Sequence, residues 1–455
     1  MNKLLFLEKK SKLFFLGIGG ISMSSLALAA KKNGHEVTGY DAAASNITRT
    51  LEENGIAVYH SFDKKHYDGV SLIVYTGAIH DDDIVLSYPR SLGIPEMKRP
   101  TFLGLMMKES RNPIGVSGTH GKSTTTGMLS SIFLSEEGRD PTILAGAVVP
   151  AVGSAFRLGE GEDFLFEACE YQNSFLDFYP RISLILNVEH DHADFFPDLR
   201  AVQDSFVKFA DRSEECAIIN YDSPGARVVA EETKTKTYYF SVTEKKDFWC
   251  ENLTEEKGFF SFDIMTKNGC FTSVSLSVAG IHNVSNALAA AGAAYLSGIS
   301  AESVKKGLEA FRGVKRRFEY RGKCGKMQVF DDYAHHPDEI CATLGSAKKM
   351  GYEKITVVFQ SHTFSRTEAL WDDFVSALSL ADSVIVADIY PAREKPIPKI
   401  TGKALAEDLE NGMYLGDFDA IASYLKDSTD GGILLVMGAG DIVNLTDLLL
   451  TDKAK

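Results

Sequence analysis

The chain has 455 residues, with 48 Lys and Arg against 62 Asp and Glu and a formal net charge of −14 at pH 7. This length predicts about three domains. The acidic balance argues against nucleic acids and membranes as partners, because their phosphates require an excess of Lys and Arg.

The six cysteines contain no C-x-x-C pair, which argues against a disulfide framework or a structural zinc site and favours a cytoplasmic protein. Short apolar strands alternate with helical patterns, as is typical of parallel α/β units. KLFFLGIGG reads as a strand and a glycine turn, followed by a helix and a strand that ends at Asp41. A second unit opens at Pro113 with a strand, the loop around Lys122 and a helix.

Residues 235–278 are rich in β-formers and predict antiparallel hairpins within or beside the second unit. A helix after Asn283 ends at Gly298, and a third unit starts near Arg312. Its strands are expected at MQVFDDY, KITVVFQSH, DSVIVADIY and GGILLVMGAGD. Because open α/β sheets bind ligands at the carboxyl ends of their strands, functional residues are expected at that end in all three units.

The first glycine turn, Gly17 to Gly20, offers backbone N–H groups at a helix start, which suit a pyrophosphate. The dinucleotide fingerprint would require a glycine where the chain has Ser22. Asp41 stands where a carboxylate can bind a ribose hydroxyl. The turn predicts a nucleotide diphosphate and leaves NAD and a UDP-sugar both open. The alternative is a strand–helix turn without a ligand.

The loop GVSGTHGKSTTT is the most specific motif of the chain. Gly118 and Gly121 allow successive N–H groups to converge on phosphate oxygens. Lys122 would then bridge the β- and γ-phosphates of ATP, and Ser123 would offer its hydroxyl to Mg²⁺. A strict P-loop has glycine where this chain has Val116, so the loop is a variant.

Acidic and imidazole groups end two further strands. Glu167 ends FLFE and Glu170 follows it, while His190 and His192 alternate with carboxylates after ISLILNV. A carboxylate and an imidazole near a phosphate loop can hold a metal ion. At least two of these groups are expected to be bystanders.

Two polar pairs follow. Asn283 and Asn286 lie three residues apart at a helix start, where amides either read an adenine edge or cap the helix. Arg316 and Arg317 lie at the start of the third unit and are either surface charges or a clamp for a transferring phosphoryl group.

Two polar segments mark the third unit, DDYAHHPDEI and FQSHTFSRT. Pro337 argues against the H-E-x-x-H helix of a metalloprotease, and Arg366 can pair with a substrate carboxylate. Scattered surface polar residues are the alternative for each position. The polar residues concerned are Asp331, Asp332, Tyr333, His335, His336, His362 and Arg366.

In chain order, GIGGISMS, GTHGKSTTT, EACE, NVEHDH, HNVSNALAA, KRRFE, DDYAHHP and FQSHTFSRT resemble the motifs of the Mur ligase family. The similarity covers nearly the whole chain. It implies an α/β fold of three domains: a Rossmann-like UDP-sugar-binding domain at 1–108, a central P-loop ATPase-like ATP-binding domain with a small antiparallel sheet at 109–312, and a Rossmann-like domain at 313–455 that closes on the amino acid and ATP.

The motifs look most like those of the family members that add L-alanine. This resemblance implies ATP- and Mg²⁺-dependent ligation of L-alanine to the lactyl carboxylate of UDP-N-acetylmuramic acid (UDP-N-acetylmuramate) through an acyl phosphate, in peptidoglycan precursor synthesis, by a monomer or homodimer. Many such members have Arg where this chain has Thr363. A related ligase that adds another amino acid or a recycled peptide is therefore the alternative.

Two other classes of protein explain fewer of these motifs. A nicotinamide-dependent dehydrogenase would leave the loop around Lys122 unexplained. A non-catalytic nucleotide-binding switch would not need polar groups at the strand ends of all three units.

The resemblance also implies roles for individual residues. Catalysis would involve Lys122, Glu167, His192, Arg316 and Arg317, and the metal would be held by Ser123, Glu167 and His192. ATP would contact Gly118, Thr119, His120, Gly121, Lys122, Ser123, Thr124, Asn283, Asn286, Asp331 and Asp332. The UDP-sugar would contact Gly17, Gly19, Gly20, Asp41 and Arg99. The amino-acid side would be formed by Tyr333, His335, His336, His362 and Arg366.

Overall fold

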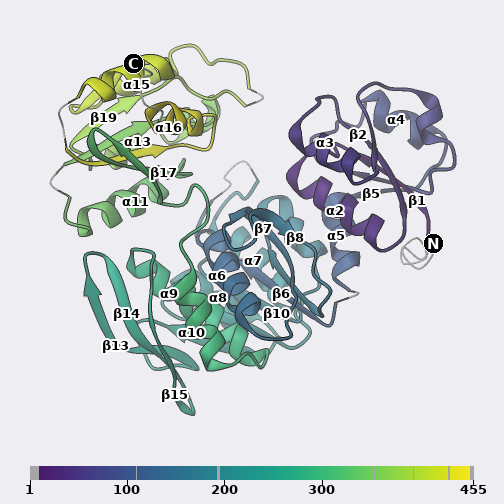
Figure 1. Cartoon of the computed structure of the whole chain (residues 1–455), viewed down its shortest axis with the longest axis horizontal. Coiled ribbons are helices and arrows are strands. Elements are labelled where there is room, and N and C mark those ends of the chain that lie inside the picture. The colour runs from purple at the N-terminus through teal and green to yellow at the C-terminus, as the bar shows by residue number, and fades with distance from the viewer. Residues whose placement is uncertain are drawn as a thin grey trace. The chain divides into compact units, whose positions relative to one another are not determined.

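The structure is a computed structural model that describes residues 10–108, 110–191, 195–352, 354–392, 394–428 and 431–450. It divides into two compact units. The first comprises Met1–Glu251, Asp263–Val274 and Ser285–Ala310, and the second comprises Asn252–Phe262, Ser275–Val284 and Phe311–Lys455. Three β-sheets follow one another along the chain, each accompanied by helices (Figure 1).

The first sheet is entirely parallel, in the order β3-β2-β1-β4-β5. Its strands are β1 (Lys12–Leu16), β2 (Glu36–Tyr40), β3 (Ala57–Tyr59), β4 (Leu72–Tyr75) and β5 (Glu96–Lys98). Its helices are α2 (Ile21–Lys32), α3 (Asn46–Glu53), η1 (Lys64–Tyr67), α4 (Ile84–Ser91) and α5 (Arg99–Met107). The strand order reverses between β1 and β4, and such a reversal creates a ligand-binding crevice at the carboxyl ends.

The second sheet has ten strands in the order β15-β14-β13-β12-β11-β10-β6-β9-β7-β8. The strands are β6 (Asn112–Ser117), β7 (Thr142–Val149), β8 (Ser154–Arg157), β9 (Asp163–Glu167), β10 (Ile182–Ile185), β11 (Cys216–Asn220), β12 (Thr237–Ser241), β13 (Phe248–Glu256), β14 (Phe259–Thr266) and β15 (Gly269–Ser275). The helices are α6 (Lys122–Ser135), η2 (Tyr171–Asp177), α7 (Leu199–Ala210), α8 (Pro224–Glu232), α9 (Ile281–Leu296) and α10 (Ala301–Ala310).

The antiparallel hairpins expected at residues 235–278 are present, but they extend the central sheet instead of forming a sheet of their own. Two-residue turns join β13 to β14 and β14 to β15, and such short turns connect antiparallel neighbours. The strand β12 is different, because it follows the crossover helix α8 and pairs with β11 in parallel. The central sheet is therefore mixed.

The third sheet has the order β16-β17-β21-β18-β19-β20, with β16 antiparallel and the other strands parallel. Its strands are β16 (Glu319–Cys324), β17 (Lys326–Asp332), β18 (Ile355–Phe359), β19 (Ser383–Val386), β20 (Gly412–Tyr414) and β21 (Gly431–Met437). Its helices are α11 (Pro337–Lys349), α12 (Phe364–Ala369), α13 (Trp371–Leu378), α14 (Gly402–Glu407), α15 (Phe418–Asp427) and α16 (Val443–Leu450). The four strands predicted here are confirmed, whereas β16 and β20 were not predicted.

Alternate residues of the third sheet face two separate hydrophobic clusters. In β18, Val357 and Phe359 pack with α11 and α13, while Val358 packs with α15 and α16. A parallel sheet covered on both faces needs such continuously apolar strands, which explains why these strands are legible in the sequence. No helix in the described ranges is long and apolar enough to cross a bilayer, and all six cysteines are free thiols.

Candidate active site

The glycine turn between β1 and α2 is held in shape by Asp41. Gly19 N–H donates to Asp41 Oδ2 at 2.8 Å, and Ala43 N–H donates to Asp41 Oδ1 at 3.1 Å. Gly17 has φ of +77°, and a Cβ at this position would lie 2.6 Å from Thr76 Cγ2. Asp41 therefore orders the predicted pyrophosphate turn through backbone N–H groups in this structure.

Arg99, the first residue of α5, reaches the same turn from 77 residues away. Its guanidinium donates to Ser22 Oγ at 3.0 Å, and burial lowers the pKa of Arg99. Gly20 immediately precedes α2, whose first turn has no side-chain cap at that position. A helix N-terminus and a guanidinium both attract a phosphate, so this corner of the first sheet carries groups of the kind that the predicted pyrophosphate site requires.

The predicted phosphate-binding loop, residues 118–121, connects β6 to α6, and two glycines allow its backbone conformation. Gly118 has φ of +144° and Gly121 has φ of +83°, both in the region that favours glycine. A Cβ on Gly118 would lie 2.9 Å from Leu186 Cβ, and a Cβ on Gly121 would lie 2.8 Å from Asn286 Oδ1. Backbone conformation and close neighbours therefore both require glycine here.

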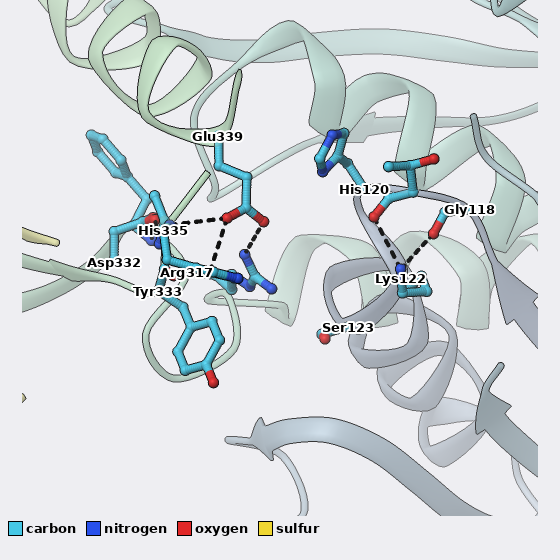
Figure 2. Close-up of polar contacts among 12 residues, drawn as sticks. Gly118, His120, Lys122, Ser123, Arg317, Asp332, Tyr333, His335 and Glu339 are labelled. Carbon is cyan, nitrogen blue, oxygen red and sulfur yellow. Dashed lines mark hydrogen bonds and ion pairs between the residues drawn. The ribbon is translucent and has the colours of Figure 1, made fainter. Parts of the chain in front are cut away.

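Lys122 begins α6 and folds back over its own loop (Figure 2). Its Nζ donates to Gly118 O at 2.6 Å and to Thr119 O at 3.0 Å, and it pairs with Glu170 at 3.0 Å. Burial lowers the pKa of Lys122, but Glu170, with smaller contributions from Cys169 and Glu167, raises it above its usual value. A charged amine is thus kept at the mouth of the loop.

Ser123 and Glu167 meet beside this amine. Ser123 Oγ donates to Glu167 Oε2 at 2.7 Å, and Gly146 N–H donates to the same oxygen at 2.8 Å. A hydroxyl and a carboxylate in contact form the hard oxygen set that Mg²⁺ prefers, since this ion is commonly bound through one or two carboxylates together with substrate phosphates. The residues present fit that ion. His192, the third predicted ligand, lies outside the described residues.

Asn187, which the sequence interpretation missed, brackets the loop from the end of β10. His120 N–H donates to Asn187 Oδ1 at 2.7 Å, and Asn187 Nδ2 donates to His120 O at 3.1 Å. Thr119 N–H donates to Asn187 O at 3.1 Å. The only signal in the sequence was the position of an amide directly after a buried strand.

The other predicted loop residues take different positions. His120 Nε2 lies 3.6 Å from Glu189, and Thr124 lies in the first turn of α6. The His190 ring contacts Phe196 O at 3.0 Å.

The two asparagines of α9 differ in what they contact. Asn286 is buried beside Gly121, so it reaches the phosphate loop. Asn283 Nδ2 instead donates to Ala279 O at 2.7 Å, the bond expected of a residue that stabilises the turn before a helix. This bond is not an N-cap, in which a side-chain oxygen accepts from a helix N–H, but it ties Asn283 to the turn before α9. Asn286 lies beside Gly121.

We expect Gly121→Ala to raise the KM for ATP about tenfold or more. A non-glycine residue with left-handed φ costs about 1–2 kcal/mol, and the added Cβ would also press on Asn286. Steady-state kinetics would measure the change. Gly138→Ala is the matched control, because Gly138 has φ of +79° and an added Cβ there would meet no heavy atom of the described residues within 4 Å. An unchanged KM for ATP in Gly121→Ala would contradict this role of the loop.

Arg316 lies at the start of the third sheet with φ of +61°. Its guanidinium donates to Gly438 O at 2.5 Å and to Gly440 O at 3.4 Å, in the loop after β21. Its Nε lies 3.5 Å from Asp331 Oδ1. Arg316 is therefore anchored to the carboxyl end of the sheet.

The two aspartates that end β17 have distinct roles. Asp332 accepts from Phe318 N–H at 2.6 Å and from Ala334 N–H at 2.8 Å, so it orders the backbone on both sides. Asp331 is fully buried, and burial raises its pKa to about 6 despite the nearby Arg316. Asp331 thus lies beside Arg316 within the sheet, and Asp332 is committed to backbone N–H groups.

Some of the residues that were predicted to bind the amino-acid substrate lie close to His362. The rings of His335 and His362 have centroids 6.1 Å apart, and Tyr390 stacks on His362 at 5.5 Å. Burial, together with the charges of His335 and Arg366, lowers the pKa of His362 to about 4. His362 is therefore a neutral imidazole at neutral pH. The sequence interpretation missed Tyr390.

His336 and Thr363 complete this region. The His336 ring lies 3.6 Å from Asp338 on the first turn of α11. Thr363 has φ of +70°, an uncommon conformation for a β-branched residue. Its N–H donates to Tyr390 O at 2.9 Å, and its carbonyl accepts from Thr367 Oγ1 at 2.6 Å. The strained residue is thus clamped between His362 and α12, which carries Arg366.

Comparisons with known proteins point to one family along nearly the whole chain. Family models described as Mur ligase family, catalytic domain, Mur ligase middle domain, and Mur ligase, glutamate ligase domain match residues 12–111, 116–294 and 316–440. The UDP-N-acetylmuramate–L-alanine ligase of Caldicellulosiruptor saccharolyticus is 43% identical over 452 residues, 98% of this chain and 99% of that protein. The ligase of the same name from Acetivibrio thermocellus is 41% identical over 455 residues, 98% and 97% of the two chains.

Solved structures give the same result for the fold. The UDP-N-acetylmuramate–alanine ligase of Thermotoga maritima superposes with a TM-score of 0.79 at 26% identity, covering 96% of this chain and 98% of that one. A murein peptide ligase from Psychrobacter arcticus superposes with a TM-score of 0.72 at 26% identity, covering 98% of this chain and 100% of that one.

Proposed function

Because the chain belongs to the Mur ligase family, we propose that it joins L-alanine to the lactyl carboxylate of UDP-N-acetylmuramate at the expense of ATP, in peptidoglycan precursor synthesis. Family models match each of its three parts. The observation that carries the choice of substrates is the end-to-end similarity, at 43% and 41% identity, to two ligases named for this reaction.

The reaction has two bond-forming steps. A lactyl carboxylate oxygen attacks the γ-phosphorus of ATP, ADP leaves, and an acyl phosphate forms. The free amine of L-alanine then attacks the acyl carbon to give a tetrahedral intermediate, which collapses to the amide as phosphate leaves and takes up the proton lost by the nitrogen. Both steps depend mainly on positioning and on neutralising charge.

The first two sheets and their loops are proposed to supply groups for the two nucleotides. We assign the pyrophosphate of the UDP-sugar to Gly17, Gly19, Gly20 and Arg99, with Asp41 ordering the turn and remaining a candidate for the ribose. The basis is the uncapped start of α2 and the guanidinium beside Ser22. The phosphates of ATP are assigned to the loop from Gly118 to Thr124, with Lys122 on the γ-phosphate.

Mg²⁺ is assigned to Ser123 and Glu167, with His192 as the third ligand predicted from the sequence. The ion, when bound, would neutralise charge that develops on the phosphoryl oxygens. The contact between the Ser123 hydroxyl and the Glu167 carboxylate supports this assignment.

The part of the chain that carries the third sheet is proposed to supply groups for the amino acid and the phosphoryl group. We assign the amino-acid carboxylate to Arg366, because a guanidinium binds a carboxylate bidentately. Neutral His362 is suited to accept a hydrogen bond from the amine, alongside Tyr333, His335 and His336. Arg316 and Arg317 are proposed to contact the phosphoryl group.

Asn283, Asn286, Asp331 and Asp332 remain proposals for the nucleoside of ATP. Asn286 has the strongest support, from its place beside Gly121. We also propose that residues 1–108, 109–312 and 313–455 act as functional domains and that the enzyme is a cytoplasmic monomer or homodimer.

We expect phosphate release only when ATP, Mg²⁺, UDP-N-acetylmuramate and an amino acid are all present. Among amino acids, L-alanine should be preferred over glycine by about 10–200-fold in kcat/KM, the range that one methyl group provides. A coupled phosphate assay with single omissions and a panel of L-alanine, glycine, L-serine and a stem tripeptide would measure this. ATP hydrolysis that does not require the UDP-sugar would contradict the ligase, and preference for the tripeptide would support the recycling alternative.

A further inference from the structure

A half-buried carboxylate, Glu339, lies in the first turn of α11, two residues after Pro337. Proline at the start of the helix fixes the backbone there and needs no N–H partner. The side chain of Glu339 is only 16% exposed, although its neighbour Asp338 is 71% exposed. One of two adjacent acids thus points into the fold, and the other points to solvent.

The two oxygens of Glu339 contact two different segments of the chain (Figure 2). Oε2 accepts from His335 N–H at 3.1 Å and lies 3.2 Å from His335 Nδ1. Oε1 accepts from Arg317 Nη1 at 3.3 Å. Arg317 comes from the segment before β16, whereas His335 comes from the loop after β17. The backbones of these two segments are already tied, because Tyr333 N–H donates to Arg316 O at 2.7 Å and β16 pairs with β17. Glu339 adds a link between the guanidinium of Arg317 and His335.

Tyr333 also contacts Arg317 and His335, the two residues that Glu339 joins. The guanidinium of Arg317 lies over the Tyr333 ring at 5.4 Å, and His335 Nδ1 contacts Tyr333 O at 2.9 Å. Burial raises the pKa of Glu339, but hydrogen bonds and charge from His335, together with the charge of Arg317, bring it well below its usual value. The carboxylate is therefore ionised, and its contact with the guanidinium of Arg317 is charge-assisted.

We propose that Glu339 is a positioning residue that holds Arg317 and His335 at a fixed separation, so that the groups for the phosphoryl group and the amino acid are presented together. This inference rests on the proposed function, because it takes Arg317 and His335 as substrate-contacting residues. Misplacing such groups by about 1 Å can cost roughly a hundredfold in rate.

Glu339→Gln tests the proposal, because it keeps the size of the side chain and removes its charge. We expect kcat to fall about 10–100-fold and the KM for the amino acid to rise, with the KM for UDP-N-acetylmuramate unchanged. Asp372→Asn is the matched control, since it removes an exposed acid from the first turn of another helix of the same unit, α13, and leaves both partners of Glu339 in place. Its kinetics should equal those of the parent enzyme.

A second readout does not depend on ligase activity. In ¹⁵N-histidine NMR spectra of the substrate-free enzyme, assigned with His335→Gln, the ring signals of His335 should move in Glu339→Gln and stay in Asp372→Asn. If the spectra change but the parent enzyme does not ligate, the proposed function fails while the link between Glu339 and His335 stands. Unchanged spectra together with parent-like kinetics in Glu339→Gln would overturn the inference, as would an equal loss of activity with every KM unchanged.

Discussion

Lys122→Met should lower kcat by about two to four orders of magnitude. A lysine beside the transferring phosphoryl group neutralises charge that develops in the transition state, and methionine has similar length but no charge. The substitution should also lower thermal stability, because Lys122 pairs with Glu170, which is only 2% exposed. Removing one partner of a buried ion pair costs about 3–5 kcal/mol.

Loss of stability and loss of chemistry can be separated with a double variant. Lys122→Met combined with Glu170→Gln removes both charges, so the melting temperature should recover towards that of the parent. The turnover number should not recover, since no cation is left at the loop. Thermal melts and single-turnover phosphate release would measure the two effects. Recovery of turnover together with stability would remove Lys122 from the chemistry and leave it a structural role.

The fold was largely predictable because the apolar segments that indicate strands in the sequence are the strands that are buried in the structure. Strands such as β1 and β18 are continuously apolar and buried on both faces, and glycine turns separate them from helices. The family prediction, made from the order of the motifs, is confirmed by the three family models. Short edge strands were harder to predict. The strand β20 has three residues, GMY, and so few residues carry no readable period.

The site was predictable where a motif is contiguous and not where partners are distant in the chain. Gly118, Gly121 and Lys122 share one loop, so their spacing alone indicates phosphate binding. Asn187 holds His120 across 67 residues, and no spacing rule connects the two. Such pairs depend on which strands become neighbours, here β10 and β6, and a single sequence does not specify strand order.

Side-chain direction was the other quantity that the sequence did not determine. Asp338 and Glu339 are adjacent acids, yet only Glu339 is turned inward. Asn283 and Asn286 have the spacing of one helix face, yet Asn283 is used by the turn before α9. Spacing gives the face of a helix, but packing decides which polar group on that face meets a partner.

Glu167→Gln is expected to reduce kcat at least about a hundredfold and to raise the Mg²⁺ concentration needed for half-maximal activity about tenfold or more. The fold should be retained for a specific reason. Ser123 Oγ and Gly146 N–H both donate to one oxygen, Oε2, and the carbonyl oxygen of glutamine can accept both bonds. The substitution therefore removes only the negative charge of the side chain. Mg²⁺ is commonly bound by one or two carboxylates together with substrate phosphates, so loss of that charge should weaken Mg²⁺ binding.

Titration of activity against Mg²⁺ at saturating ATP would measure this change, with thermal melts to confirm that the variant is folded. Glu162→Gln is the matched control, because Glu162 precedes the same strand, is exposed and pairs with Arg111 at 2.8 Å. Its Mg²⁺ dependence should equal that of the parent enzyme. Lower activity in Glu167→Gln with an unaltered Mg²⁺ requirement would contradict the metal assignment and would leave Glu167 the separate role of ordering Ser123 and the β7 strand at Gly146.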